Sequence, residues 1–154
     1  MNIAKLLTPD RTHCNIDGVS KKRVLENLSL FLNDDESGLS GTDSDAIYQK
    51  LLERERLGST GIGSGVAVPH CRVPGCSKIT GVLLKLSDQV DFDAIDGKPV
   101  DLVFALMVPQ EHSDEHLNAL ASIAELMQSE EVRQRLRGAT SDRDLFNLAT
   151  EYSG

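Results

Sequence analysis

The sequence lacks a long hydrophobic segment. Its longest uninterrupted apolar run, Leu102 to Val108, is far shorter than the roughly 20 residues that cross a bilayer. The first residues, Met1 to Pro9, also lack an apolar signal core that ends in small residues. We therefore expect a soluble, cytoplasmic protein without membrane insertion.

Positive charge and cysteine are also scarce. The 154 residues carry 16 Lys and Arg against 24 Asp and Glu, a formal net charge of −8. No broad cationic face is then available for a phosphate backbone, so nucleic acid is not an expected partner. The three cysteines (Cys14, Cys71 and Cys76) are an odd number, which favours reduced thiols over a disulfide framework. A chain of this length can bury one core, and we expect a single domain over residues 1–154.

Hydrophobic spacing predicts two helices in the first third of the sequence. One covers about 21–32 and follows Ser20, a good N-cap residue. The second follows a capping-box sequence, Thr42 to Asp45, and ends near Glu55. The polar, glycine-containing residues 33–43 between them are expected to form a loop.

The last third is also predicted to be helical. A strong amphipathic helix follows Ser113, a second helical stretch lies at 132–136, and a capped helix covers about 142–151.

The middle of the chain carries the predicted strands. Residues 66–68 and 79–86 have strand character, and residues 90–95 either pair with the latter or precede a turn at Asp96-Gly97. The continuous apolar run at 102–108 is typical of a central strand covered on both faces, which requires helices on both sides of the sheet. The predicted class is α/β.

A glycine-rich segment at 58–65 precedes a histidine. Four glycines in eight residues permit positive φ angles and close approach to a ligand, and predict an irregular loop. Neither nucleotide fingerprint fits, because Ser64 stands where a P-loop has lysine and Val66 where a dinucleotide loop has glycine. What remains is a set of amides and hydroxyls that can face an anion, directly before Pro69 and His70.

A glycine-rich segment directly before a histidine is suited to a histidine that carries phosphate. Neutral imidazole is a nitrogen nucleophile near pH 7, and one ring nitrogen can attack while a hydrogen bond orients the other. Transfer of a phosphoryl group is catalysed by positioning and by cations that receive its negative charge. Arg54 can offer a planar fork to two phosphoryl oxygens, and His116 is a second candidate. No cofactor is needed.

Three segments resemble one protein family. They are Arg54 to His70 (RERLGSTGIGSGVAVPH), Phe92 to Pro109 (FDAIDGKPVDLVFALMVP) and His116 to Leu120 (HLNAL). Together they resemble the enzyme IIA proteins of the bacterial phosphoenolpyruvate-dependent sugar phosphotransferase system, mannitol/fructose class. Within that class the chain is most similar to the free-standing nitrogen-regulatory branch, because no IIB or IIC domain is attached and the helix start Ser20 to Arg23 also fits.

The resemblance implies a function and a fold. His70 would accept phosphate from a histidine-containing phosphocarrier protein, with Arg54 and His116 flanking the phosphoryl group and Ser59, Thr60 and Gly61 contributing to phosphate binding. The chain would be a phosphohistidine carrier, not a turnover enzyme, and would control target proteins such as transporters or kinases. The implied fold is a mixed sheet of about five strands between helices, and a homodimer is possible.

One position departs from the family pattern. Cys71 and Arg72 follow His70, where a glycine and a basic residue are expected, and this bears on the local shape of the chain.

Two other functions stay open. A sugar-specific enzyme IIA would pass the phosphate to a IIB protein. A zinc hydrolase could use His70, His112 and His116, since the last two lie one helical turn apart. The helix lacks the glutamate that a zinc protease carries beside its first histidine, and zinc does not explain the glycines. The acidic series Asp91 to Asp96 does not have the spacing of a calcium loop, so no metal is predicted.

Overall fold

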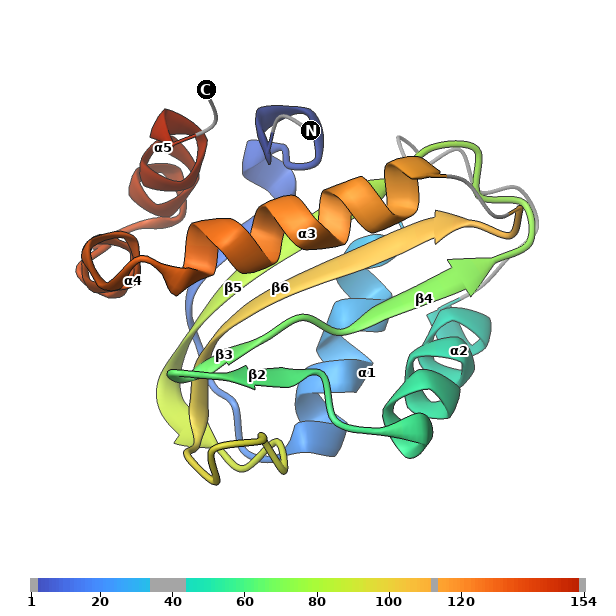
Figure 1. Ribbon diagram of the computed structural model, residues 1–154, viewed down its shortest axis with the longest axis horizontal. Helices are drawn as coiled ribbons and strands as arrows, with labels where there is room; N and C mark the ends of the chain where they lie inside the picture. The colour runs from blue at the N-terminus through green and yellow to red at the C-terminus, as the bar shows by residue number, and fades with distance from the viewer. Residues whose placement is uncertain (1–2, 34–43, 112–113, 153–154) are drawn as a thin grey trace.

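One mixed β-sheet forms the centre of the computed structural model, which describes residues 3–33, 44–111 and 114–152 (Figure 1). Six strands are arranged in the order β1-β5-β6-β3-β2, and β4 also pairs with β6. Their bounds are β1 Thr12–Ile16, β2 Gly61–Gly63, β3 Val66–Ala67, β4 His70–Val73, β5 Thr80–Val90 and β6 Val100–Pro109. The predicted α/β class and mixed sheet are confirmed, with six strands in place of about five. Strands β1, β2 and β4 are not predicted from the sequence.

Strand β6 is the central element of this sheet. It runs antiparallel to β5 and parallel to both β3 and β4. Its residues alternate between two hydrophobic clusters: Leu102, Phe104 and Leu106 belong to one, Val103 and Ala105 to the other. Successive strand side chains point to opposite faces, so the continuous apolar run serves both. The predicted central strand covered on both sides is confirmed.

Helices cover both faces of the sheet, as predicted (Figure 1). Helices α1 (Lys21–Leu32) and α2 (Ser44–Leu57) contribute to one cluster. Helices α3 (Asp114–Gln128), α4 (Glu130–Arg137) and α5 (Asp142–Glu151) contribute to the other, together with the short 3-10 helix η1 (Ile3–Lys5), which precedes a second one, η2 (Pro9–Arg11). Among the described residues, no helix has the length and apolar character needed to span a membrane.

Serine side chains fix where three of the helices begin. The hydroxyls of Ser20, Ser129 and Ser141 accept hydrogen bonds from the backbone N–H three residues later, at 3.1, 3.3 and 3.0 Å, which satisfies one donor that the first turn leaves unpaired. The predicted caps at Thr42 and Ser113 lie outside the described residues. Helix α2 continues two residues beyond the predicted end at Glu55.

The glycine-rich segment is more regular than the predicted irregular loop. It contains β2, which pairs antiparallel with β3 in a tight hairpin. The turn of this hairpin has left-handed backbone, with φ of 101° at Gly63, 58° at Ser64 and 79° at Gly65. Glycine adopts such angles at little cost, so the glycines serve the turn.

Other predicted strands differ in their bounds. The strand predicted over 66–68 ends at Ala67, and the one predicted over 79–86 continues to Val90. Residues 91–95 do not form a strand, and the other alternative, a turn that includes Asp96 and Gly97, is confirmed by a hydrogen bond from the N–H of Gly97 to the carbonyl of Ala94 at 2.9 Å. They belong to the connection that leads from β5 to β6, across which Val90 pairs with Val100.

Candidate functional site

His70 is the first residue of β4, directly after a break in the sheet. Strands β3 and β4 both pair with β6, and between them Val68 and Pro69 leave the ladder. The carbonyl of Pro69 accepts a hydrogen bond from the N–H of Leu106 at 2.9 Å. This bond holds the chain next to β6 across the break between β3 and β4. Because proline favours extended backbone in the residue before it, Pro69 also fixes the conformation of Val68.

Two hydrogen bonds select one tautomer of the half-buried His70 ring. Its Nδ1 lies 2.9 Å from the carbonyl oxygen of Val68. A carbonyl only accepts, so Nδ1 carries the hydrogen. On the other side of the ring, Nε of Arg54 donates to Nε2 of His70 at 3.2 Å, which requires a lone pair on Nε2. Both contacts therefore leave the lone pair of the ring on Nε2.

The surroundings keep this ring neutral. Burial is the main cause that lowers the pKa of His70 below its usual value of 6.5, and the charges of Arg54 and Arg72 lower it further. The hydrogen bond to Val68 and the carboxylate of Glu55 act in the opposite direction without reversing the shift. Near pH 7 the imidazole thus has the protonation state that a nucleophile needs.

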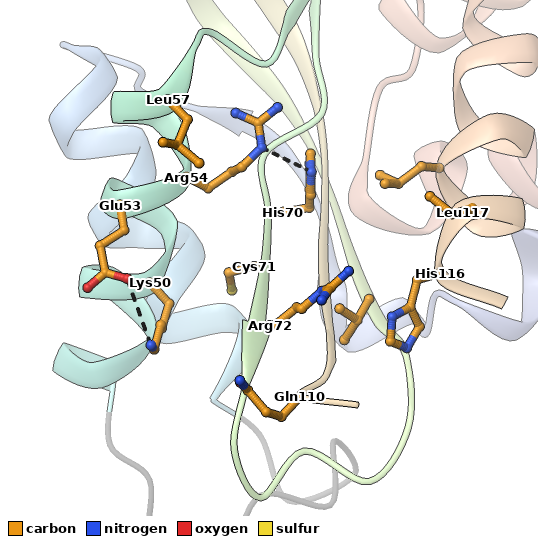
Figure 2. A pocket seen from close by; sticks show the side chains of 12 residues that line it. Lys50, Glu53, Arg54, Leu57, His70, Cys71, Arg72, Gln110, His116 and Leu117 are labelled. Carbon is orange, nitrogen blue, oxygen red and sulfur yellow. Dashed lines mark hydrogen bonds and ion pairs between the residues drawn. The ribbon is translucent and has the colours of Figure 1, made fainter. Parts of the chain in front are cut away.

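Arg54 is held beside His70 by its own chain. It lies in the last turn of α2, and one terminal nitrogen, Nη1, donates to the carbonyl of Gly58 at 2.8 Å, four residues later. This contact restrains the guanidinium while Nε faces the imidazole (Figure 2). The structure therefore brings together two of the residues predicted for catalysis.

Glu55 organises the same region from below the surface. Its side chain is 3% exposed and forms an ion pair with Lys21 of α1 at 2.9 Å. The carboxylate also accepts hydrogen bonds from the backbone N–H of Thr60, at 3.2 Å, and from the Thr60 hydroxyl. Lys21 in turn donates to the carbonyl of Phe92 at 3.4 Å. One buried carboxylate thus ties α1, α2 and the glycine-rich segment together.

Glu55 is not predicted as a site residue from the sequence, although a signal for it exists. Residues 53–56 alternate in charge, as a solvated helix face does. Helical spacing nevertheless places Glu55 four residues after Leu51 and eight after Ile47, both fully buried. A carboxylate that continues an apolar stripe has to find a partner inside the protein.

The residues predicted to bind phosphate are hydrogen-bonded within the protein. The hydroxyl of Thr60 donates to Glu55 and that of Ser59 to the carbonyl of Phe92. Ser59 also accepts from the N–H of Gly61 at 3.0 Å. A Cβ added to Gly61 would lie 2.8 Å from that of Ala94, so glycine is needed there for close packing. In this structure these three residues fix the hairpin beside His70, and their contact with phosphate stays a prediction.

Side chains from two other elements hold the tip of the hairpin. The N–H of Ser64 donates to the carboxylate of Asp96 at 2.9 Å, and its carbonyl accepts from Nη2 of Arg137 at 2.7 Å. Arg137, the last residue of α4, forms an ion pair with Asp101 at 2.9 Å. The left-handed turn at Ser64 is therefore fixed through both of its backbone polar groups.

A cavity of about 610 Å³ opens in front of His70. Helix α2 contributes Lys50 and Arg54, and β4 contributes His70 and Arg72 (Figure 2). His116, which is 5% exposed, lines the cavity from the first turn of α3. In Figure 2 its ring lies towards the end of the cavity that holds Arg72, while Arg54 points directly at His70.

The described part of the chain does not assemble a three-histidine zinc site. His112 lies outside the described residues, and no group of three or more metal-ligating side chains occurs among the residues that are described. The only lone pair of the His70 ring faces the guanidinium of Arg54, where a bound cation would be repelled.

The first prediction concerns the protonation of His70. In an NMR titration, the ring should change protonation with a midpoint below 6.5 and carry its hydrogen on Nδ1 at neutral pH. The variant Arg54→Gln should raise this midpoint, because a charge that lowers the pKa is removed. Arg56→Gln, which removes an exposed charge of the same helix outside the cavity, should leave it unchanged. An unshifted midpoint in Arg54→Gln would contradict the role assigned to this guanidinium.

The second prediction concerns the buried carboxylate. Glu55→Gln keeps the size of the side chain but removes the partner of Lys21, and should lower the free energy of unfolding by about 1–3 kcal/mol. Glu53→Gln, at an exposed position of the same helix, should change it by less than about 0.5 kcal/mol. Urea unfolding of the two variants measures the difference, and equal stability would show that Glu55 does not organise the region.

Comparisons with known proteins find relatives over nearly the whole chain. Residues 5–152 match the family described as phosphoenolpyruvate-dependent sugar phosphotransferase system, EIIA 2. The nitrogen regulatory protein of Pseudomonas aeruginosa is 42% identical over 151 residues, which cover 98% of this chain and 96% of the relative.

Solved structures show the same fold. The crystal structure of nitrogen regulatory protein IIA-Ntr from Neisseria meningitidis superposes with a TM-score of 0.88 at 35% identity, covering 96% of this chain and 99% of that one. The mannitol IIA of Escherichia coli shares the fold with a TM-score of 0.74 at 22% identity, covering 93% of this chain and 98% of that one. The chain therefore belongs to the EIIA 2 family of the phosphoenolpyruvate-dependent sugar phosphotransferase system.

Proposed function

We propose that this chain is a phosphoryl carrier of the nitrogen-regulatory type. Nε2 of His70 takes a phosphoryl group from a histidine-containing phosphocarrier protein, and the phosphorylated and unphosphorylated forms act differently on target proteins such as transporters or kinases. The observation that carries the proposal is the pairing of a neutral, oriented imidazole with the guanidinium of Arg54. Similarity to nitrogen regulatory proteins over nearly the whole chain supports the regulatory branch.

The transfer step follows from the hydrogen bonds of the ring. The lone pair of Nε2 forms the new N–P bond while the N–P bond of the donor phosphohistidine breaks and its electron pair returns to the donor ring. The hydrogen on Nδ1 stays in place, and the carbonyl of Val68 stabilises the positive charge that the His70 ring gains. Arg54 loses its acceptor on Nε2 and can donate to the phosphoryl oxygens instead.

Phosphorylation changes the charge of a partly apolar surface. A phosphoryl group adds roughly −1.5 to −2 charges at a cavity whose rim includes Leu57, 85% exposed, and Leu117, 56% exposed. A partner protein that covers these apolar side chains would have this negative charge within its interface when His70 is phosphorylated, and would not have it when His70 is unphosphorylated. We propose this as the physical basis of regulation, in a single cytoplasmic domain that spans residues 1–154.

Phosphorylation itself can be tested by intact-mass measurement. The wild-type chain, incubated with phosphoenolpyruvate and the upstream phosphocarrier proteins, should gain a single acid-labile phosphate, and His70→Ala should gain none. Phosphate on His70→Ala would contradict the proposal. Subsequent transfer from the phosphorylated chain to isolated IIB domains would favour the alternative, a sugar-specific enzyme IIA.

The rate of phosphorylation tests the role of Arg54. Arg54→Gln should slow phosphoryl transfer on the order of 100 to 1000-fold, the usual effect of losing one preorganised donor to a transition state. Arg56→Gln serves as the matched control and should transfer at the wild-type rate. Quench-flow measurement of phosphohistidine gives both rates, and an Arg54→Gln rate within a few-fold of wild type would remove Arg54 from the mechanism.

A further inference from the structure

Thr60 and Val68 lie opposite each other at the open end of the hairpin formed by β2 and β3. Gly61 pairs with Ala67 in the antiparallel ladder, and Thr60 and Val68 are the next pair along the two segments. The N–H of Val68 donates to the carbonyl of Thr60 at 2.9 Å. In a hydrogen-bonded antiparallel pair the two residues exchange both of their N–H···O bonds. A regular ladder would therefore also direct the N–H of Thr60 to the carbonyl of Val68.

Glu55 replaces the second bond of this pair. Its Oε2 accepts a hydrogen bond from the N–H of Thr60 at 3.2 Å, and its Oε1 accepts one from the Thr60 hydroxyl. The carbonyl of Val68 instead accepts a hydrogen bond from Nδ1 of His70 at 2.9 Å. The carbonyl that orients His70 is thus the one whose partner in the ladder is bound by Glu55.

The carboxylate of Glu55 is fixed in this position. The residue is 8% exposed, and its Oε2 also forms the ion pair with Nζ of Lys21 at 2.9 Å. Lys21 is anchored in turn at Phe92, through a hydrogen bond to the carbonyl at 3.4 Å and through its Nζ, which lies 5.2 Å from the ring centroid. Hydrogen bonds to an ionised acceptor are stronger than those to a neutral one. The N–H of Thr60 therefore favours Glu55 over the carbonyl of Val68.

Two consecutive residues of α2 act on the two nitrogens of the His70 ring. Neighbouring side chains of a helix point about 100° apart. Arg54 faces the cavity and donates to Nε2 at 3.2 Å (Figure 2). Glu55 points into the protein and, by binding Thr60, leaves the carbonyl of Val68 to Nδ1. The end of one helix thus influences both hydrogen bonds of the imidazole.

We propose that Glu55 is a positioning residue for phosphoryl transfer to His70. By accepting the N–H of Thr60, it keeps the carbonyl of Val68 out of the hairpin ladder and available to Nδ1. Without an acceptor at position 55, the N–H of Thr60 turns to Val68 and competes with the imidazole for that carbonyl. Part of the molecules then carry the ring hydrogen on Nε2, where it blocks the lone pair. The effect on the transfer rate rests on the proposed function, whereas the effect on the ring does not.

Three substitutions of Glu55 separate the need for a hydrogen-bond acceptor from the need for a charge. Glu55→Gln loses the charge, but its amide oxygen can accept from the N–H of Thr60 and its NH2 group can donate to the Thr60 hydroxyl. Glu55→Asp keeps a charge for Lys21, but its side chain is one methylene shorter and leaves the N–H of Thr60. Glu55→Met has a similar length and supplies neither a charge nor a strong acceptor.

NMR correlation of the ring nitrogens with the ring hydrogens, in the unphosphorylated full-length chain, measures the tautomer of His70. The wild-type chain and Glu55→Gln should carry the hydrogen on Nδ1. Glu55→Asp and Glu55→Met should show a substantial population with the hydrogen on Nε2.

The transfer rate from the upstream phosphocarrier protein should follow the tautomer. At saturating donor, Glu55→Asp and Glu55→Met should accept phosphate about 10–100-fold more slowly, the size of effect that a small misplacement of a reacting group can have. Glu55→Gln should stay within a few-fold of the wild-type rate. The donor concentration that gives half of the maximal rate should not change, because Glu55 is buried and does not meet the donor.

A matched control separates positioning from stability. Ile47→Val removes one buried methyl group from the same helix and lowers stability without touching Thr60, so it should keep the wild-type tautomer and rate. Urea unfolding checks that each variant is folded, and Glu55→Asp carries the test if Glu55→Met is not.

The outcomes are distinct. A hydrogen retained on Nδ1 in Glu55→Asp, or a loss in Glu55→Gln as large as in Glu55→Asp, would overturn the proposal. If His70 takes no phosphate, the proposed function fails and the tautomer result stands. If the tautomer does not respond, the role of Glu55 fails and the phosphoryl-carrier proposal stands.

Discussion

The hydrogen bond between Nδ1 of His70 and the carbonyl of Val68 is the constraint on which the site depends. It places the ring hydrogen on Nδ1 and directs the lone pair of Nε2 at Arg54. Without it the ring could rotate or exchange tautomers, and the guanidinium would face an N–H group. Pro69 restricts the backbone conformation of Val68, and so helps to orient the carbonyl that holds the ring hydrogen on Nδ1.

The rest of the fold serves to hold that geometry at the surface. Strand β6 supplies a rigid support for β3 and β4, because it is buried on both faces and paired on both sides. The ion pair between Lys21 and Glu55 joins α1 to α2 at the residue that follows Arg54, and Thr60 links the hairpin to the same carboxylate. Arg137 and Asp96 hold the far end of the hairpin. A phosphoryl group would therefore arrive at a preorganised site, which is the main requirement of this chemistry.

Local patterns predicted much of the fold, and long-range pairing accounts for what they missed. The continuous apolar run of β6 predicts a strand buried on both faces. Ser20 marks the start of α1, because its hydroxyl accepts a hydrogen bond from the backbone N–H three residues later. Strand β1, Thr12–Ile16, carries no comparable signal because it exists through its pairing with β5, which lies about 70 residues away in sequence. The sequence motif also places Arg54 near His70, but the tautomer depends on backbone atoms that no side-chain pattern encodes. Helical spacing could have marked Glu55 as buried, but its partners, Lys21 and Thr60, come from other segments and do not follow from that spacing.

The position of the phosphoryl group on the imidazole tests the central claim most directly. NMR correlation of phosphorus with the ring nitrogens of the phosphorylated chain reports which nitrogen is bonded. Both hydrogen bonds of the ring predict phosphate on Nε2, with the hydrogen retained on Nδ1 beside Val68. Phosphate on Nδ1 would mean that the ring abandons both contacts before it reacts, and would contradict the claim that these contacts select the reactive nitrogen.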